Sequence, residues 1–370
     1  MKKILFISLA VVLALSIGLI GCEGEGEGEG EVVWDYEIEL TLHPTISQFA
    51  SICELVIFPW VDEVHDLVGP DGGTFNITIV TPGDSPYDAA SSLSAISIGT
   101  TDIGMLSPET FHLGGAGYLP FEFDSIEQTA YVMYKLWTET PTWDANGQLD
   151  GVKILITMPL WGSQLWTTLL GGNVTEAADM VDLKIRTDAQ AVESATLQAL
   201  GSIPTFLGVS ELAGALQTNQ IHGCFFTYSG IGGAADLGGV TNYTTELNMI
   251  YRPYSLAMNL DAYNDLPDDA KTALDSVTGL DASVAWATAH LVGEADDKDA
   301  TINGPCFMPP PPTCYPEYGR PITYPDIGTF ETATAGVAGD WGTYMTDTLG
   351  YDGAGILARI DALKAEYDAL

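Results

Sequence analysis

The chain has 370 residues, of which 50 are acidic and 12 are basic, so its formal net charge is −38 at pH 7. This charge argues against nucleic-acid binding, because contacts to phosphates require clustered Lys and Arg. Hydrophobic residues make up 46% of the chain, which excludes general disorder. The length predicts two domains or one large two-lobed body.

The first 22 residues have the pattern of an export signal. Two lysines are followed by an uncharged apolar run over 4–20, and the segment ends in Leu-Ile-Gly-Cys at Cys22. Leu-x-Gly-Cys resembles the lipobox of bacterial lipoproteins, in which the Cys becomes the lipidated first residue. The alternative is an uncleaved membrane anchor, for which the run is at the short limit. We expect 1–22 to be a lipoprotein signal peptide with lipidation at Cys22.

A segment of alternating Glu and Gly follows the signal. Residues 23–31 contain no apolar side chain, which predicts an extended, solvated tether over 23–35. A lipid and a tether would hold the protein beside a membrane, lipid-anchored in the periplasm or at the cell surface. This placement narrows the function to extracytoplasmic binding, envelope enzymology or sensing.

The remaining cysteines indicate no metal site. Cys306 and Cys314 could form a disulfide in an oxidising compartment. Cys53 and Cys224 lie in apolar patterns typical of buried thiols. Without a Cys-x2-Cys or His-x3-His spacing, we expect neither a metal nor a cofactor.

Strand-like and helix-like segments alternate along the rest of the chain. The predicted elements, in order, are strand 36–42, helix 45–68, strand 74–81, helix 89–98, strand 103–106, helix 125–138 with Asp124 as N-cap, strand 152–157, helices 189–200 and 211–217, strands 221–226 and 249–258, and helices 267–292 and 356–370. Such alternation predicts parallel sheets covered by helices on both faces. The Pro-rich segment 304–321 fits neither a helix nor a strand.

Two runs of this α/β pattern predict a two-lobed periplasmic-binding-protein-like fold with a hinge and an inter-lobe ligand cleft. The runs join near 157–165 and 247–252. The expected division is lobe 1 over 36–160 plus 250–290, lobe 2 over 161–249 plus 291–350, and a C-terminal helix over 351–370.

A search for catalytic motifs finds none. The chain lacks a Gly-x4-Gly-Lys-Ser/Thr phosphate loop, a His-Glu-x-x-His motif and a Gly-x-Ser-x-Gly elbow. The glycine-rich runs at 114–117 and 230–233 are expected to be loops. The five histidines are scattered, although a catalytic His–carboxylate pair could still form in the fold.

Several short motifs follow one another in a characteristic order. They are Asp182-Leu-Lys-Ile-Arg186, Ala199-Leu-Gly-Ser-Ile-Pro204, the segment from Glu211 to Gly223, Ile98-Gly99 with Asp102-Ile-Gly104, Leu119-Pro-Phe121 with Phe123, and Met258-Asn259 ahead of Leu266-Pro267. This order resembles the solute-binding proteins of tripartite ATP-independent periplasmic (TRAP) transporters, from about Tyr36 to the C-terminus.

The resemblance implies a ligand contact for Arg186. In that family the Arg of Lys-Ile-Arg pairs with the ligand's carboxylate, and a guanidinium meets a carboxylate with two parallel hydrogen bonds. The alternative is a surface arginine paired with Asp182 or Asp188. His43 and Ser107 lie where contacts from lobe 1 fall in the family, and are further candidates.

The chain also departs from the family pattern. Sialic-acid-type members carry a second Arg about twenty residues before the first, where this chain has Trp166. The aromatic candidates for the site are Trp161, Trp166, Phe225, Phe226 and Tyr228. Aromatic walls favour an apolar or aromatic acid over a C4-dicarboxylate or a sugar acid. The alternative is that several of these rings belong to the core.

The resemblance therefore implies an extracytoplasmic solute-binding lipoprotein without enzymatic activity. It would capture a small organic acid and deliver it to the small and large integral-membrane permease subunits of a TRAP transporter. One alternative is a binding lipoprotein of the same fold that serves a sensor. Another is an envelope hydrolase.

Overall fold

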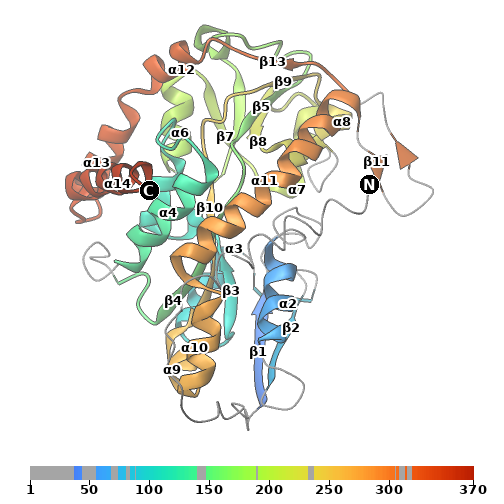
Figure 1. Cartoon of the computed structure of the whole chain (residues 1–370). Helices are drawn as coiled ribbons and strands as arrows, with labels where there is room; N and C mark the ends of the chain where they lie inside the picture. Colours follow the sequence, from blue (N-terminus) through green and yellow to red (C-terminus); the bar gives the residue numbers. More distant parts are fainter. Residues whose placement is uncertain are drawn as a thin grey trace.

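The computed structural model describes residues 37–43, 56–67, 74–80, 84–87, 89–139, 147–188, 191–231, 237–304, 306–307, 313–314 and 319–370 (Figure 1). Cys22, the Glu-Gly segment and Cys53 lie outside these residues, as does part of the predicted helix 45–68. No helix in the described ranges is long and apolar enough to cross a membrane.

The first sheet has five strands. Their order is β2 (Thr74–Ile79), β1 (Glu37–His43), β3 (Ile103–Leu106), β10 (Pro253–Asn259) and β4 (Val152–Pro159). β1 runs parallel to β2 and β3, whereas β10 runs antiparallel to both β3 and β4. A strand from the second half of the chain thus lies between two strands from the first half.

The second sheet has six strands. Their order is β13 (Ile322–Thr323), β9 (Tyr243–Thr245), β5 (Gln164–Thr167), β8 (Gly223–Phe226), β6 (Lys184–Thr187) and β7 (Ile203–Phe206). β6 runs parallel to β7 and β8, but β5 runs antiparallel to β8 and β9. The expectation of parallel sheets is wrong for β5 and β10, because each strand begins where the chain has just crossed from the other sheet.

Two segments in which the chain crosses between the sheets, 160–163 and 246–252, lie against each other. The amide of Leu160 donates to the Arg252 carbonyl at 2.8 Å, and the amide of Ser163 donates to the Ile250 carbonyl at 2.9 Å. The side chain of Gln164 accepts from the Leu247 amide at 2.8 Å. These two crossings therefore form a short, hydrogen-bonded pair, and the chain passes between the sheets again on its way from β10 to β13.

Helices cover both sheets. They are α2 (Phe58–Asp66), α3 (Ala89–Ser97), α4 (Ile126–Thr138), α6 (Ala191–Ala199), α7 (Val209–Gln217), α8 (Leu237–Val240), α9 (Leu260–Asp265), α10 (Asp268–Ser276), α11 (Gly279–Asn303), α12 (Ile327–Thr334), α13 (Val337–Asp347) and α14 (Gly353–Asp368), with 3-10 turns η2 (Pro108–Thr110), η3 (His112–Tyr118), η4 (Ala177–Met180) and η5 (Tyr228–Ile231). In Figure 1 the long helix α11 runs diagonally along the molecule, from beside β4 toward α7 and α8.

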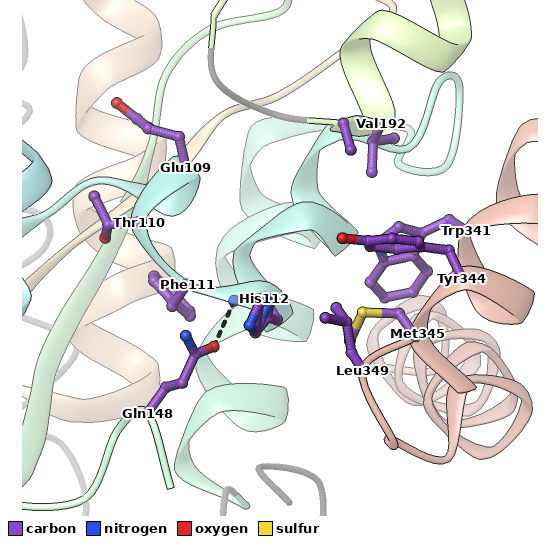
Figure 2. A pocket seen from close by; sticks show the side chains of 11 residues that line it. Glu109, Thr110, Phe111, His112, Gln148, Val192, Trp341, Tyr344, Met345 and Leu349 are labelled. Atoms are coloured by element: carbon purple, nitrogen blue, oxygen red, sulfur yellow. Dashed lines mark hydrogen bonds between the residues drawn. The ribbon is translucent and has the colours of Figure 1, made fainter. Parts of the chain in front are cut away.

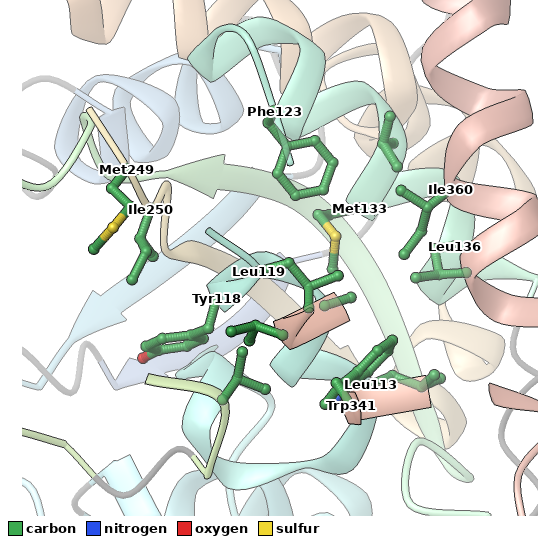
Figure 3. Close-up of a cluster of buried hydrophobic side chains, with 14 of the residues drawn as sticks. Leu113, Tyr118, Leu119, Phe123, Met133, Leu136, Met249, Ile250, Trp341 and Ile360 are labelled. Carbon is green, nitrogen blue, oxygen red and sulfur yellow. The ribbon is translucent and has the colours of Figure 1, made fainter. Parts of the chain in front are cut away.

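The core has three main parts. One cluster lies on one face of the first sheet with α2 and α10, and a second lies on one face of the second sheet with α7 and α8. The largest cluster joins the remaining faces of both sheets to α4, α13 and α14, and includes Met249 and Ile250 of a crossing (Figure 3). Hydrophobic packing therefore continues across the region where the two sheets meet.

The predicted helix 267–292 is wrong in one respect, because the structure has two helices there. Thr278 is extended, with φ −127° and ψ −178°, and Gly279 has φ 93°. Such a positive φ suits glycine and interrupts a helix. α11 then continues to Asn303, beyond the predicted end.

Three smaller predictions need correction: the N-cap of α4, the glycine-rich loops and the Pro-rich segment. The N-cap of α4 is Ser125, not Asp124, because the Ser125 hydroxyl accepts from the Gln128 amide at 3.1 Å. The predicted loop at 114–117 is a run of 3-10 turns within η3, and Gly230 lies in the 3-10 turn η5. Within 304–321, β11 (Cys306–Phe307) and β12 (Thr313–Cys314) pair as short strands.

Candidate functional site

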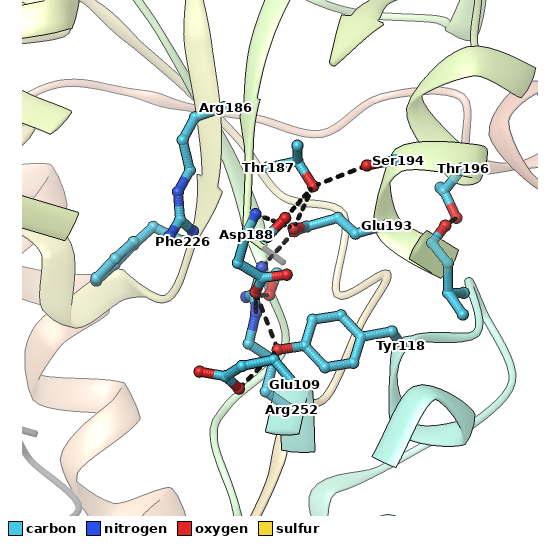
Figure 4. A network of polar contacts seen from close by, with 12 residues as sticks. Glu109, Tyr118, Arg186, Thr187, Asp188, Glu193, Ser194, Thr196, Phe226 and Arg252 are labelled. Atoms are coloured by element: carbon cyan, nitrogen blue, oxygen red, sulfur yellow. Dashed lines mark hydrogen bonds and ion pairs between the residues drawn. The ribbon is translucent and has the colours of Figure 1, made fainter. Parts of the chain in front are cut away.

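Arg186 is buried on β6, the strand next to the β7 edge of the second sheet. Only 7% of the residue is exposed, and its Nε donates to the Leu207 carbonyl at 3.0 Å. β8 places Cys224 opposite Arg186, so Phe226, two residues on, shares the same face (Figure 4). Among the described residues no carboxylate lies within 4.0 Å of this guanidinium. Arg186 is therefore neither a surface arginine nor paired with Asp182 or Asp188.

A second buried arginine, Arg252, anchors a network of polar contacts. It forms an ion pair with Glu193 of α6, and its Nη1 donates to the Ser163 hydroxyl at 2.6 Å. Its Nε lies 3.5 Å from Asp188 Oδ2. Burial and Asp188 raise the pKa of Glu193, while Arg252 opposes that rise. Arg252 and Ser163 lie on the two crossings, so the network joins the crossings to the second sheet.

Tyr118 links this network to the first sheet. Its hydroxyl donates to Asp188 Oδ2 at 2.9 Å and lies 3.4 Å from Glu109 Oε2 (Figure 4). Glu109 belongs to η2, directly after β3. Burial raises the pKa of Glu109 and the Asp188 charge adds to the rise, while Arg252 and the Tyr118 hydroxyl oppose it. Two carboxylates from different sheets therefore face one phenol.

The Tyr254 hydroxyl lies among the same charges. Burial raises the pKa of Tyr254, the carboxylates of Glu109 and Asp188 add to the rise, and Arg252 and Arg186 oppose it. The side chain is 9% exposed. Since β10 brings Ser255 opposite Leu106, Tyr254 comes beside Ser107.

Ser107 and His43 lie at the ends of adjacent strands. The Ser107 hydroxyl is completely buried and has no hydrogen-bond partner in the described part of the chain. His43 Nδ1 is 2.9 Å from the Ser85 hydroxyl, and its ring meets Tyr87 edge-on at 5.1 Å. Burial lowers the pKa of His43, against the nearby charge of Asp102. The structure brings Ser107 beside the network and gives His43 its own polar partner.

The five aromatic candidates differ in surroundings. Trp161 packs on the His290 ring at 4.6 Å and donates from Nε1 to the His290 carbonyl at 2.9 Å. Trp166 and Phe225 are 0% exposed on the two faces of the second sheet, and Tyr228 donates its hydroxyl to Glu246. These four have the surroundings of core residues. Phe226 is partly exposed beside Arg186.

A cavity of about 220 Å³ lies behind Glu109 (Figure 2). η2 and η3 form one side, including His112, whose amide donates to Gln148 Oε1 at 2.8 Å. α6 and α13 form the other side, including Val192 and Trp341. Glu109 therefore stands between this cavity and the charged network.

The sequence analysis did not predict most of the network. It missed Glu109, Tyr118, Glu193, Arg252 and Tyr254, and it missed the contact between Asp188 and Arg252. One signal was available for Arg252. It is one of only 12 basic residues and follows the apolar stretch Met-Ile-Tyr, where a buried cation requires a carboxylate. Across the described residues no group of three or more His, Cys, Asp or Glu could hold a metal ion.

The two-sheet arrangement is that of solved TRAP solute-binding proteins. The chain superposes on the protein of Rhodoferax ferrireducens with copurified benzoate at a TM-score of 0.76, with 19% identity, over 90% of this chain and 99% of that one. It superposes on the protein of Bordetella bronchiseptica with bound (R)- and (S)-mandelate at a TM-score of 0.70, with 19% identity, over 89% of this chain and 99% of that one. The predicted two-lobed fold is confirmed.

Sequence comparison identifies the family. Residues 72–291 match bacterial extracellular solute-binding protein family 7, and this chain belongs to that family. The C4-dicarboxylate-binding periplasmic protein DctP of Rhodobacter capsulatus is 24% identical over 225 residues. That match covers 60% of this chain and 64% of the length of that relative. The resemblance to TRAP solute-binding proteins is confirmed.

Proposed function

We propose that this protein captures a small organic acid outside the cytoplasm and delivers it to the membrane subunits of a TRAP-type transporter. The observation that carries the proposal is Arg186, a buried cation without a carboxylate partner in the described structure. A buried unpaired charge is costly, and a ligand carboxylate would compensate it. The guanidinium is held by the Leu207 carbonyl, so it is oriented before a ligand arrives.

The relatives support an acid as the ligand. One of the two similar structures holds copurified benzoate and the other holds mandelate, and the DctP relative is a C4-dicarboxylate-binding protein. All of these ligands carry a carboxylate. Phe226 beside Arg186 offers an apolar surface for the rest of such a ligand, and Ser107 and Tyr254 offer hydroxyls from the first sheet.

The proposed division of the body follows the sequence prediction. Lobe 1 comprises 36–160 plus 250–290, lobe 2 comprises 161–249 plus 291–350, and 351–370 is a C-terminal helix. The crossings at 160–163 and 246–252 would form the hinge. A ligand held by Arg186 and by lobe 1 favours the closed state to the extent that it binds that state more tightly. Capture and release involve no covalent step.

The proposed location and partners complete this function. Lipidation at Cys22 would retain the protein at the membrane, and 23–35 would serve as the tether. The closed, loaded protein would then dock on the small and large permease subunits. Their recovery with the ligand-loaded protein tests delivery, and recovery of a sensor protein in their place would contradict it.

The ligand test is thermal unfolding of residues 34–370 with small carboxylates and with their neutral amides. A bound acid at ~100 times its dissociation constant adds ~2.7 kcal/mol, which raises Tm by several degrees, whereas the amide leaves it unchanged. Arg186→Ala should weaken acid binding at least tenfold, or ~1.4 kcal/mol, because it removes the guanidinium.

Arg359→Ala is the matched control. Arg359 lies on α14 and pairs with Glu139 and Glu366, away from the site. It should leave affinity for the acid unchanged. If the parent protein and Arg186→Ala bind the acid with equal affinity, Arg186 is not part of the ligand site. If the acid and its amide raise Tm equally, the ligand is not recognised through its carboxylate.

A further inference from the structure

The arginines of the site are not equivalent. Arg252 is fully engaged, with Glu193, the Ser163 hydroxyl and Asp188 around its guanidinium. Arg186 has only the neutral Leu207 carbonyl as an acceptor in the described part of the chain. One positive charge is therefore available to a ligand, and it lies on the second sheet.

The carboxylates of the site are not equivalent either. Glu193 is paired with Arg252, and Asp188 accepts from Tyr118 and lies near Arg252. Glu109 has no Lys or Arg nitrogen within 4.0 Å among the described residues. Its carboxylate accepts from the Tyr118 hydroxyl, which is 3.4 Å away and also donates to Asp188. One negative charge is therefore also available, and it lies beside the first sheet.

Two buried hydroxyls lie on the Glu109 side. Ser107 is 0% exposed and its hydroxyl has no partner among the described residues, and Tyr254 lies beside Ser107 on the adjacent strand β10. Asp188, two residues after Arg186, shares the Tyr118 hydroxyl with Glu109 (Figure 4). Arg186 and Glu109 therefore lie on either side of one short network, with Arg186 on the second sheet and Glu109 beside the first.

We infer that the ligand is a zwitterion, an amino acid or a related aminated acid, whose carboxylate binds Arg186 and whose ammonium binds Glu109. The inference rests on the proposed function and narrows its ligand class. A zwitterion neutralises both unpaired groups. A simple acid leaves Glu109 uncompensated, and a dicarboxylate sets its second negative charge against Glu109 and Asp188.

The same pairing would draw the sheets together. Arg186 belongs to β6 of the second sheet, and Glu109 follows β3 of the first. A zwitterion that contacts both Arg186 and Glu109 reaches its full affinity only when the two sheets are close. This dependence is the condition for ligand-driven closure. A simple acid has only the Arg186 half of that interaction.

The experiment compares matched ligands by calorimetry on residues 34–370. The ligands are butyrate with its 2-, 3- and 4-amino derivatives, 3-phenylpropionate with phenylalanine, and succinate. At least one aminated acid should bind ten or more times more tightly than its parent acid. Glu109→Gln should abolish that preference, because it removes the carboxylate that would contact the ammonium. Arg186→Ala should weaken binding of both.

Glu63→Gln is the matched control, because Glu63 is an exposed carboxylate on α2. It should leave every affinity unchanged, and unfolding of the ligand-free variants verifies that each is folded. If a parent acid binds through Arg186 as tightly as every aminated form, the inference of a zwitterionic ligand is wrong but the proposed function is not. The same conclusion follows if the preference for an aminated acid persists in Glu109→Gln. Failure of every acid, aminated or not, to bind overturns both.

Discussion

Three buried arginines show how partners decide the role of a charge. Arg186, Arg252 and Arg320 are 7%, 6% and 8% exposed. Burial opposes the charge of Arg252, but Glu193, Tyr118 and Asp188 together outweigh burial and raise the pKa of Arg252. Arg320 donates to the Thr241 hydroxyl and the Gly238 carbonyl, both at 2.7 Å, and burial lowers its pKa to about 10. Arg252 and Arg320 are structural, which leaves Arg186 for a ligand.

Gly114 is the residue at which an added methyl group should do most damage near the site. A Cβ there would lie 1.9 Å from the Pro108 carbonyl oxygen, so backbone would have to move. Gly114→Ala should lower the free energy of unfolding by about 1–3 kcal/mol, as overpacking does, and should displace η2 with Glu109. Chemical denaturation measures the first effect.

Gly214→Ala is the opposite case and the control. Gly214 lies within α7, and nothing lies within 4 Å of its would-be Cβ. Alanine there should stabilise the protein by up to ~1 kcal/mol through helix propensity. Equal effects of the two substitutions would show that the contact with Pro108 does not matter.

The site was predictable from sequence only where a motif marked it. Arg186 follows from the Lys-Ile-Arg motif, and Ser107 from the end of a short buried strand. Arg252 and Glu193 are 59 residues apart, and Arg252 and Ser163 are 89 apart. Such pairings arise from the tertiary fold, so periodicity and local propensity carry no trace of them.

α11 is the element that ties the two sheets together. It packs against α4 and β4 near the first sheet and against η5 near the second. Its later half carries Glu294 and Lys298, and Lys298 pairs with Glu246, the first residue of the crossing 246–252. Burial raises the pKa of Glu294 to about 7, Glu246 adds to the rise, and Lys298 opposes it.

Glu294 should make the stability of the protein fall as the pH rises. The unfolded carboxyl ionises near its ordinary pKa of 4.5 and the folded one near 7. The folded state therefore holds a proton that the unfolded state has lost, and this stability disappears as the pH passes through about 7. Glu294→Gln should raise the free energy of unfolding by about 1–3 kcal/mol at alkaline pH, and by little near pH 4.

Urea denaturation at both pH values measures this difference. Glu331→Gln on α12 is the control, because Glu331 is exposed. A stabilisation by Glu294→Gln that is the same at both pH values would contradict the raised pKa.

Most elements were predictable from local pattern, and the exceptions have physical causes. β3 has the predicted bounds, and α3 and α7 differ by one or two residues, because their hydrophobic spacing is clear. Apolar periodicity runs through Val277 and conceals the break between α10 and α11. Strand direction in β5 and β10 depends on the crossings between sheets, which strand periodicity does not encode.

At the scale of the whole molecule, the lipid anchor can be tested at Cys22. Cys22→Ser removes the thiol that would carry the lipid. The N-terminus of the mature parent protein should be Cys22 and should carry lipid, whereas the variant should carry none, because the thiol is the site of attachment. Mass spectrometry of the N-terminal peptide in the membrane fraction measures both. A parent protein without lipid on Cys22 would contradict lipidation.

The place of β10 has a consequence for the order of folding after export. β3 and β4 are complete by residue 159, but the strand that separates them spans Pro253–Asn259. Until that strand has crossed the membrane, the facing edges of β3 and β4 lack the partner that lies between them, and such edges are prone to pair with other chains. The first sheet is therefore completed only when the second half of the chain has arrived.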